Sequence, residues 1–167
     1  MTNTSNDMFT LIQYFALNNV KYVICGGVAC VLQGVERATY DIDLSVSLDD
    51  ENLKKIIDIC SKFNMIPRIP EPVTNLLDKS IRDSWIEEKG ALVYTFVSNS
   101  SPLQLDIFLT YPITYEELEK NADVIEINTI QVIVSSIPDL IRAKKSINPP
   151  RKKDLIDIEE LEALINE

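Results

Sequence analysis

Two aspartates one residue apart, Asp41 and Asp43, are the first residues of this 167-residue chain whose type and spacing suggest chemistry. They lie in TYDIDLSV, where polar and apolar residues alternate as in a half-buried strand, so both carboxylates leave one face roughly 6 to 7 Å apart. Such carboxylates repel each other, and a hard cation such as Mg²⁺ or Mn²⁺ relieves the repulsion. A solvated sheet face produces the same pattern, and the pair alone favours that simpler interpretation.

A third carboxylate occurs later, in the predicted strand LQLDIFL. There Asp106 alternates with apolar residues and shares a face with Gln104 and Phe108. Three carboxylates from neighbouring strands can hold two metal ions about 4 Å apart, an arrangement that suits in-line displacement at phosphorus. Asp41, Asp43 and Asp106 are therefore candidate metal-binding and catalytic residues, although each of these motifs by itself is explained more simply by a solvated sheet face.

A pair of glycines, Gly26 and Gly27, precedes the two aspartates. They stand between a short apolar run, KYVIC, and a predicted helix, VACVLQG. Such a turn bends tightly, leaves backbone amides open to an anion and directs a helix N-terminus at the same point, which makes a phosphate cradle. Taken alone, the glycines are better explained by a plain strand-to-helix turn, and neither the Walker loop nor the dinucleotide-binding glycine pattern is present.

Composition narrows the chemistry further. The chain has no histidine, which excludes Ser-His-Asp triads, Cys-His pairs and histidine-ligated metals. Its net charge of −10 argues against broad adhesion to nucleic acid or anionic membranes. Basic residues nevertheless gather in one segment, at Arg142, Lys144, Lys145, Arg151, Lys152 and Lys153.

The cysteines and the apolar runs indicate the compartment. Cys25, Cys30 and Cys60 are odd in number and lie in apolar contexts, as reduced core thiols of a cytoplasmic protein do. No apolar run approaches the roughly 18 residues needed to cross a bilayer. We expect a cytoplasmic protein that has no membrane partner.

The elements that must position these residues follow from hydrophobic periodicity. Strands are expected at residues 21–25, 39–46, 91–97, 103–109, 123–128 and 129–134, with 91–97 and 103–109 forming an antiparallel pair. Helices are expected around residues 8–15, 28–34, 53–63, 73–88, 114–120 and from Pro138 onward. A last helix is expected to turn Leu155, Ile158, Leu161 and Ile165 toward the core.

These elements predict the fold class. We expect a mixed, largely antiparallel β-sheet flanked by helices, of the α/β or α+β class. Residues 1–167 should form a single domain, because the chain shows no linker, and residues 138–167 should form a C-terminal helical pair packed on it.

The order of these motifs resembles the nucleotidyltransferase superfamily that includes DNA polymerase β. The resemblance runs over residues 22–46, 103–109 and 136–161. Within it, PDLIRAKKSINPPRKKDLIDIEEL is similar to a segment of the bacterial nucleotidyltransferases related to the AbiEii abortive-infection toxins. Asp139 and Lys144 have the matching spacing, and Arg151, Lys153 and Asp154 follow.

The resemblance implies a role for each motif. Gly26 and Gly27 would hold the triphosphate of an NTP, such as ATP. Asp41 and Asp43 would bind both magnesium ions, and Asp106 would help to bind the catalytic one near the attacking hydroxyl.

The resemblance also implies roles for the cations. Lys144 would reach a phosphate of the nucleotide, with Arg151 and Lys153 as helpers, whereas Lys145 and Lys152 are explained equally well by the charge preference of a helix C-terminus. Arg37 would steady the aspartates or contact the substrate, or it forms a surface ion pair with an acid such as Glu36.

The activity implied is metal-dependent transfer of a nucleoside monophosphate from an NTP to a hydroxyl of RNA, a protein or a small molecule, with release of pyrophosphate. Many members carry Gly-Ser where this chain has Gly26-Gly27, and larger members add a helical domain that selects the acceptor. Here the acceptor would bind a shallow surface or be supplied by a partner protein. Two alternatives stay open: a catalytically silent nucleotide-binding or partner-binding protein of a toxin-antitoxin or phage-defence system, with a cognate antitoxin, and a plain acidic interaction domain.

Overall fold

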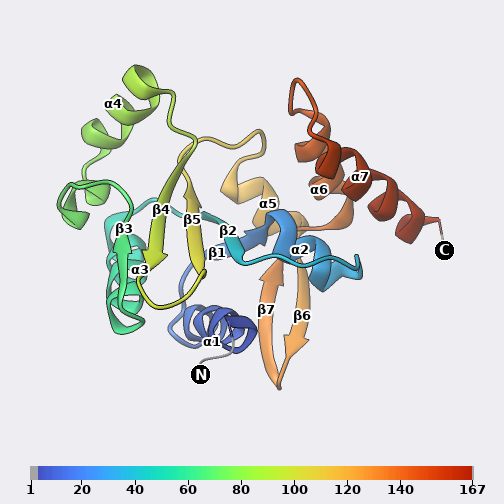
Figure 1. Cartoon of the computed structure of the whole chain (residues 1–167), viewed down its shortest axis with the longest axis horizontal. Coiled ribbons are helices and arrows are strands. Elements are labelled where there is room, and N and C mark those ends of the chain that lie inside the picture. The colour runs from blue at the N-terminus through green and yellow to red at the C-terminus, as the bar shows by residue number, and fades with distance from the viewer. Residues whose placement is uncertain (1–3, 167) are drawn as a thin grey trace.

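A seven-stranded sheet forms the centre of the molecule (Figure 1). The structure is a computed structural model that describes residues 4–166. The strands follow the spatial order β3-β4-β5-β2-β1-β7-β6. Their bounds are β1 (Tyr22–Cys25), β2 (Asp41–Val46), β3 (Met65–Pro67), β4 (Val93–Ser98), β5 (Gln104–Phe108), β6 (Asp123–Ile127) and β7 (Ile130–Val134).

The sheet is mixed, as expected. β2 runs parallel to β5, and β1 runs parallel to β7. The other pairings, β1 with β2, β3 with β4, β4 with β5 and β6 with β7, are antiparallel. The parallel pairing in the middle places β2 beside β5 although about sixty residues separate them.

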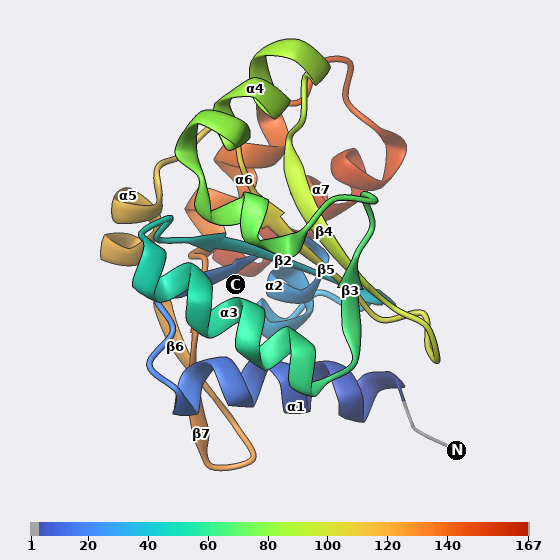
Figure 2. The same cartoon turned by 90° about the vertical axis from the view of Figure 1, so that its left-hand side faces the viewer.

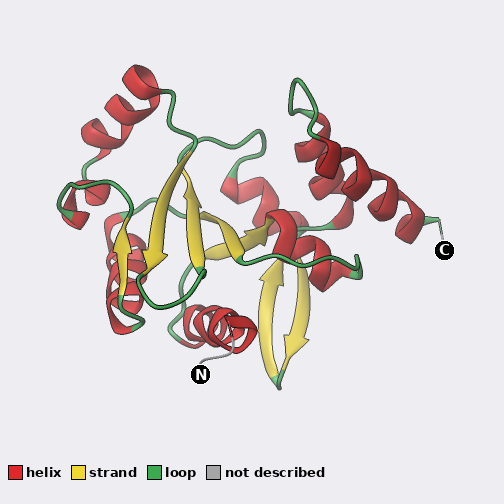
Figure 3. Cartoon of the chain, in the orientation of Figure 1, coloured by secondary structure: helices red, strands yellow, loops and turns green. Residues whose placement is uncertain are grey.

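Helices alternate with the strands along the chain (Figure 3). They are α1 (Thr4–Leu17), α2 (Gly26–Gln33), α3 (Asp50–Lys62), the 3₁₀ helix η1 (Val73–Leu77), α4 (Lys79–Lys89), α5 (Tyr115–Asn121), α6 (Ile137–Lys145) and α7 (Lys152–Ile165). Side-chain caps define several of their starts: Asp49 accepts a hydrogen bond from the Asn52 backbone amide at α3, and Ser136 does the same for Asp139 at α6.

Two predicted details of the helices and strands are wrong. The helix expected over residues 73–88 is interrupted at Asp78, whose carboxylate accepts hydrogen bonds from the backbone amides of Ser80 and Ile81 and so begins α4 anew. The short strand β3 was not expected, because prolines interrupt the pattern beyond it. It pairs only with β4, at an edge of the sheet, which is where proline is tolerated.

The two faces of the sheet are covered differently. α1 and α3 lie side by side on one face and close the main hydrophobic core (Figure 2). The other face carries a smaller apolar cluster, formed by Val23 and Cys25 of β1, Ile113, Leu118 of α5 and Ala143 of α6. This second face holds the odd-numbered residues of β2, and part of it lies open beside the cluster.

The C-terminal helices α6 and α7 pack on each other, and α6 also contacts α2. The predicted apolar stripe of α7 is wrong at two positions, since Leu155 and Ile165 are 54% and 52% exposed. The buried face of α7 consists instead of Asp154, Asp157 and Leu161, which lie on one side of a helix at spacings of three and four. Two carboxylates thus replace apolar residues at the helix interface.

Within residues 4–166, no helix has the length and apolar character that a membrane span requires.

Candidate active site

Asp43 and Asp106 are direct neighbours across the parallel pair β2–β5. Because side chains alternate along a strand, in-register partners leave the same face of the sheet, and the two carboxyl groups come together on the face opposite α1 and α3. The sequence predicts this grouping if the two strands are adjacent. The structure confirms the adjacency.

Three hydrogen bonds from two neighbouring side chains orient Asp106. The Thr95 hydroxyl, on the neighbouring strand β4, donates to Oδ1 of Asp106 at 2.6 Å. The Gln104 amide donates to both carboxylate oxygens at 3.1 Å. The carboxylate therefore has a fixed direction before any ligand binds.

Asp43 is the electrostatically perturbed member of the pair. Its pKa is raised to about 7, mainly by burial and also by the nearby carboxyl groups of Asp106 and Asp41, while the charge of Lys144 lowers it. The position disfavours a lone negative charge. A bound cation would offset the electrostatic cost of ionising Asp43, so the donor set fits a hard divalent metal ion.

Asp41 lies two residues before Asp43 on the same face, opposite Gln104 of β5, and its side chain is exposed. Within the described part of the chain, no three His, Cys, Asp or Glu side chains already have the spacing of a metal site. The structure thus presents a close carboxylate pair with a third carboxylate near its rim. Metal binding by the three together stays a prediction.

The two glycines begin α2 rather than forming a loop before it. Gly26 has φ +63°, and a Cβ at this position would lie 2.0 Å from Oδ2 of Asp43. A side chain is therefore excluded on steric grounds and by backbone conformation. The helix N-terminus, where backbone amides have no partner within the helix, therefore stands directly against the Asp43 carboxylate.

Arg37 lies over the same helix start. A Cβ on Gly27 would come within 3.2 Å of the Arg37 guanidinium and of the Thr39 hydroxyl. Arg37 forms an ion pair with Asp157 of α7, a buried acid of the C-terminal helix rather than a surface neighbour such as Glu36, and its contact with substrate stays a prediction. This contact joins the α2–β2 connection to α7.

Lys144 is buried, and its ammonium group pairs with two aspartates of α7. Its Nζ lies 2.9 Å from Asp157 and 3.6 Å from Asp154. Both aspartates are almost completely inaccessible, at 0% and 3% exposure for Asp154 and Asp157. Lys144 is thus held at the site by two acids, and its charge lowers the pKa of Asp43.

Arg151 completes this charged cluster, which consists of Arg37, Lys144, Arg151, Asp154 and Asp157. Its guanidinium donates to both oxygens of Asp154 at 2.7 and 3.0 Å. Burial alone would raise the pKa of Asp154, but the hydrogen bonds and charge of Arg151 and the charge of Lys144 lower it. The hydrogen bond to Asp154 raises the pKa of Arg151, and Asp43 contributes to that rise.

Lys153 stands apart from this cluster. It is exposed on α7, and among the described residues no hydrogen bond or ion pair connects it to a partner. Its role as a helper at the phosphates stays a prediction.

Several residues of the site were not expected from the sequence. Asp157 was overlooked, although its spacing of three from Asp154 placed both acids on one helix face. Thr95 gave no signal, because its role depends on β4 lying beside β5. Cys25, opposite Asp43 across β1 and β2, is no nucleophile, since burial and the Asp43 charge raise the pKa of its thiol to about 12.

Comparisons with solved structures identify the fold. The lincomycin-bound lincosamide antibiotic adenylyltransferase LnuA matches with a TM-score of 0.64 at 16% identity, over 95% of this chain and 96% of that chain. The antibiotic-resistance factor ANT(2'')-Ia matches with a TM-score of 0.58 at 13% identity, over 98% and 90% of the two chains. An antigenic nucleotidyltransferase-like protein from Paracoccidioides brasiliensis matches at 0.55 and 18% identity, over 96% and 77%.

The chain therefore has the nucleotidyltransferase fold. No protein-family model and no curated protein sequence matches the chain.

Proposed function

We propose that this protein is a metal-dependent nucleotidyltransferase, which moves a nucleoside monophosphate from an NTP to a hydroxyl acceptor. The observation that supports this most directly is that Asp43 has two neighbours: Asp106, with which it is in register, and the N-terminus of α2, which packs against it at Gly26. A paired carboxylate site beside a helix start brings cation and phosphate binding to one point.

The residues present fit the implied metal. Asp43 and Asp106, with Asp41 at the rim, would hold Mg²⁺ or Mn²⁺, two ions in the full arrangement. When bound, these ions would neutralise the charge that develops on the phosphates. Thr95 and Gln104 hold Asp106 in a fixed direction, so little reorganisation is needed when the nucleotide binds.

The charged cluster would bind the triphosphate. It contains three cations and two carboxylates and so carries a net charge of about +1 in a chain of net charge −10. Arg37 lies over Gly27, and Lys144 and Arg151 both act electrostatically on Asp43. The phosphates would thus lie between the α2 N-terminus and the C-terminal helices.

The proposed reaction is a substitution at phosphorus. The acceptor oxygen forms a bond to the α-phosphorus, the bond from that phosphorus to the β-bridging oxygen breaks, pyrophosphate leaves, and the acceptor proton passes to water. The protein contributes position and charge, which are the main sources of catalysis in phosphoryl transfer.

The size of the chain is compatible with turnover. LnuA is described as an antibiotic adenylyltransferase, and ANT(2'')-Ia has been solved in complex with adenylyl-2''-tobramycin. The likeness to these two extends over 96% and 94% of their own lengths. A separate large acceptor domain is therefore not a requirement of this fold, and a small-molecule acceptor is the class that these neighbours favour.

Incubation with each α-labelled NTP, Mg²⁺ and fractionated cell extract tests the proposal. The unmodified chain should transfer label, and Asp43→Ala and Asp41→Ala should lose transfer by about a hundredfold or more. Asp58→Asn, an exposed acid on α3 at the other face, is the matched control and should retain transfer. Label transfer that persists in both aspartate variants would refute the assignment.

The alternative is binding without turnover, in a toxin-antitoxin or phage-defence protein of the AbiEii-like group with a cognate antitoxin. Calorimetric binding of Mg²⁺-NTP by a chain that releases no pyrophosphate with any extract fraction would favour it. Absence of both binding and transfer would favour the plain acidic interaction domain.

A further inference from the structure

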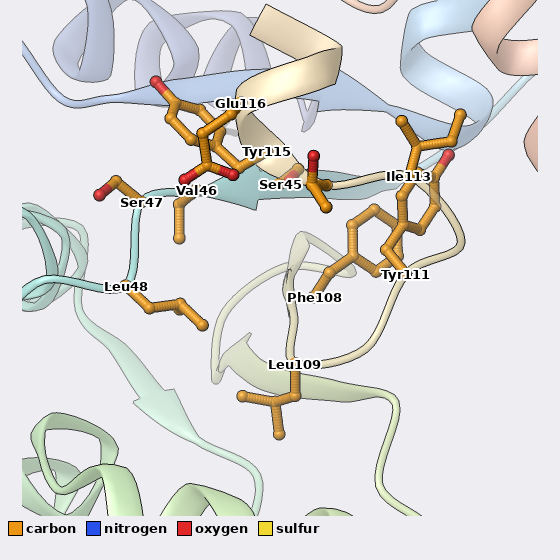
Figure 4. A pocket seen from close by; sticks show the side chains of 11 residues that line it. Ser45, Val46, Ser47, Leu48, Phe108, Leu109, Tyr111, Ile113, Tyr115 and Glu116 are labelled. Carbon is orange, nitrogen blue, oxygen red and sulfur yellow. The ribbon is translucent and has the colours of Figure 1, made fainter.

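A pocket of about 270 Å³ opens on the carboxylate face, beyond Asp43 and Asp106 along their own strands. Ser45 of β2 and Phe108 of β5 line it, each two residues after one of the two aspartates. Because residues two apart on a strand leave the same face about 6 to 7 Å apart, the pocket begins one side-chain position from the carboxylate pair. Figure 4 shows both side chains at the pocket.

Along β2 the pocket lining begins at Ser45, after Asp43, whereas Arg37 of the charged cluster precedes the strand. α5 and the segment that links it to β5 form its outer wall, whereas the charged cluster lies with α2, α6 and α7. A nucleotide held at the cluster would therefore leave the pocket free. In-line substitution requires the attacking oxygen and the leaving pyrophosphate on opposite sides of the α-phosphorus, and an acceptor in the pocket with a nucleotide at the cluster would meet this requirement.

The lining of the pocket is aromatic and hydroxylic, with negative charge at its edge. Phe108 and Tyr111 stack with ring centroids 4.2 Å apart. Hydroxyl groups come from Ser45, Ser47 and Thr114, and the carboxylate comes from Glu116. Burial, together with the negative charges of Glu119, Glu116 and Asp49, raises the pKa of the Tyr115 hydroxyl, so acidic groups lie near this wall of the pocket.

We infer that this pocket is the acceptor site and that it takes a small hydroxylated molecule carrying a positive charge, with the size of a single ring, rather than RNA. That the bound molecule is an acceptor rests on the proposed function. The pocket volume of about 270 Å³ lies below the roughly 300 to 1,000 Å³ of sites for drug-sized ligands, which limits the occupant to about one ring. The aromatic pair suits the C–H face of such a ring, and Glu116 suits a cation, whereas a polyanion would meet repulsion.

A binding experiment without nucleotide tests the pocket separately from turnover. The ¹⁵N-labelled chain is titrated with glucosamine, glucose and glucuronate, which share one ring and differ in charge. Glucosamine should shift the amide signals of pocket residues such as Ser45, Thr114 and Glu116, with a Kd of about 1 to 10 mM for a ligand of this size. Glucose should bind more weakly, and glucuronate should leave the pocket signals unchanged.

Two glutamates on the same turn of α5 provide a matched pair of variants. Glu116→Gln removes the charge that lines the pocket and should weaken glucosamine binding about twofold to fivefold. Glu117→Gln removes the same charge one residue on, where the side chain pairs with Arg142 outside the pocket lining, and should leave the affinity unchanged.

The outcomes separate this inference from the proposed function. Glucosamine binding that Glu116→Gln weakens, in a chain that transfers no label from any NTP, would retain the pocket and refute the enzyme. Label transfer to RNA or protein, with no glucosamine shifts at the pocket, would retain the enzyme and overturn the inference. Equal binding of glucuronate and glucosamine would also overturn it.

Discussion

The carboxylate of Asp43 occupies the space in which a side chain at Gly26 would begin: a Cβ there would lie 2.0 Å from Asp43 Oδ2. The end of β1, the start of α2 and the Asp43 carboxylate are thereby packed in direct contact. The glycine is required by this contact as well as by its positive φ of +63°. Substitution at this position should therefore affect the site as well as the backbone.

Gly26→Ala should destabilise the chain by about 2 to 3 kcal/mol and abolish nucleotide transfer, because Asp43 must move. Gly90→Ala is the matched control, since Gly90 has φ +62° and no atom within 4 Å of an added Cβ. It should lose only about 1 kcal/mol, from the backbone strain, and keep its activity. Urea unfolding and label transfer measure both effects. Equal losses in the two variants would show that the contact with Asp43 has no importance of its own.

Asp157→Asn should reduce the free energy of unfolding by about 3 kcal/mol, because Asp157 is the buried partner of both Arg37 and Lys144. The comparison is Glu162→Gln, which breaks the exposed ion pair of Glu162 with Lys145 and should change the free energy of unfolding by less than about 1 kcal/mol. Denaturant titration followed by circular dichroism gives both values. Similar values for the two variants would contradict the view that the charged cluster fixes α7 in place.

The stability of the metal-free chain should depend on Asp43 between about pH 4 and pH 7. Its folded pKa of about 7 lies above the usual value, so the folded chain keeps a proton that the unfolded chain releases, and stability falls as pH rises through this range. Asp43→Asn removes that loss and should stabilise the chain at pH 8 by on the order of 2 kcal/mol, and not at pH 4. Thermal unfolding in chelator at both pH values is the measurement, with Asp58→Asn as control. A pH-independent effect of Asp43→Asn would show that ionisation of Asp43 does not destabilise the folded chain.

Thr95→Val should lower transfer about tenfold while changing the free energy of unfolding by only about 1 kcal/mol, because it removes the hydroxyl that orients Asp106. Thr74→Val, at an exposed position of η1, serves as the control and should leave transfer unchanged. Transfer rates and denaturant midpoints are compared for the two variants. Full activity in Thr95→Val would mean that Gln104 alone is sufficient to orient the carboxylate.

The sequence predicted much of the fold, because hydrophobic period and turn residues are local signals. The strand holding Asp41 and Asp43, the helix after Gly27 and the antiparallel pair formed by β4 and β5 all follow from short stretches of sequence. The division of the predicted helix at Asp78 was missed, because a cap competes with continued periodicity at that residue. The buried side of α7 was also missed, because a carboxylate that is paired across an interface looks like a surface residue when read alone.

The sequence by itself determined which groups are available: carboxylates on alternating strands, a glycine turn, a basic C-terminal segment, and no histidine. Only the tertiary structure decided which of them meet. The register of β2 with β5 brings Asp43 to Asp106, and the packing of α7 brings Asp157 to Arg37 and Lys144. Strand register across distant segments and the side of a helix that is buried both depend on non-local contacts, which no short stretch of sequence specifies.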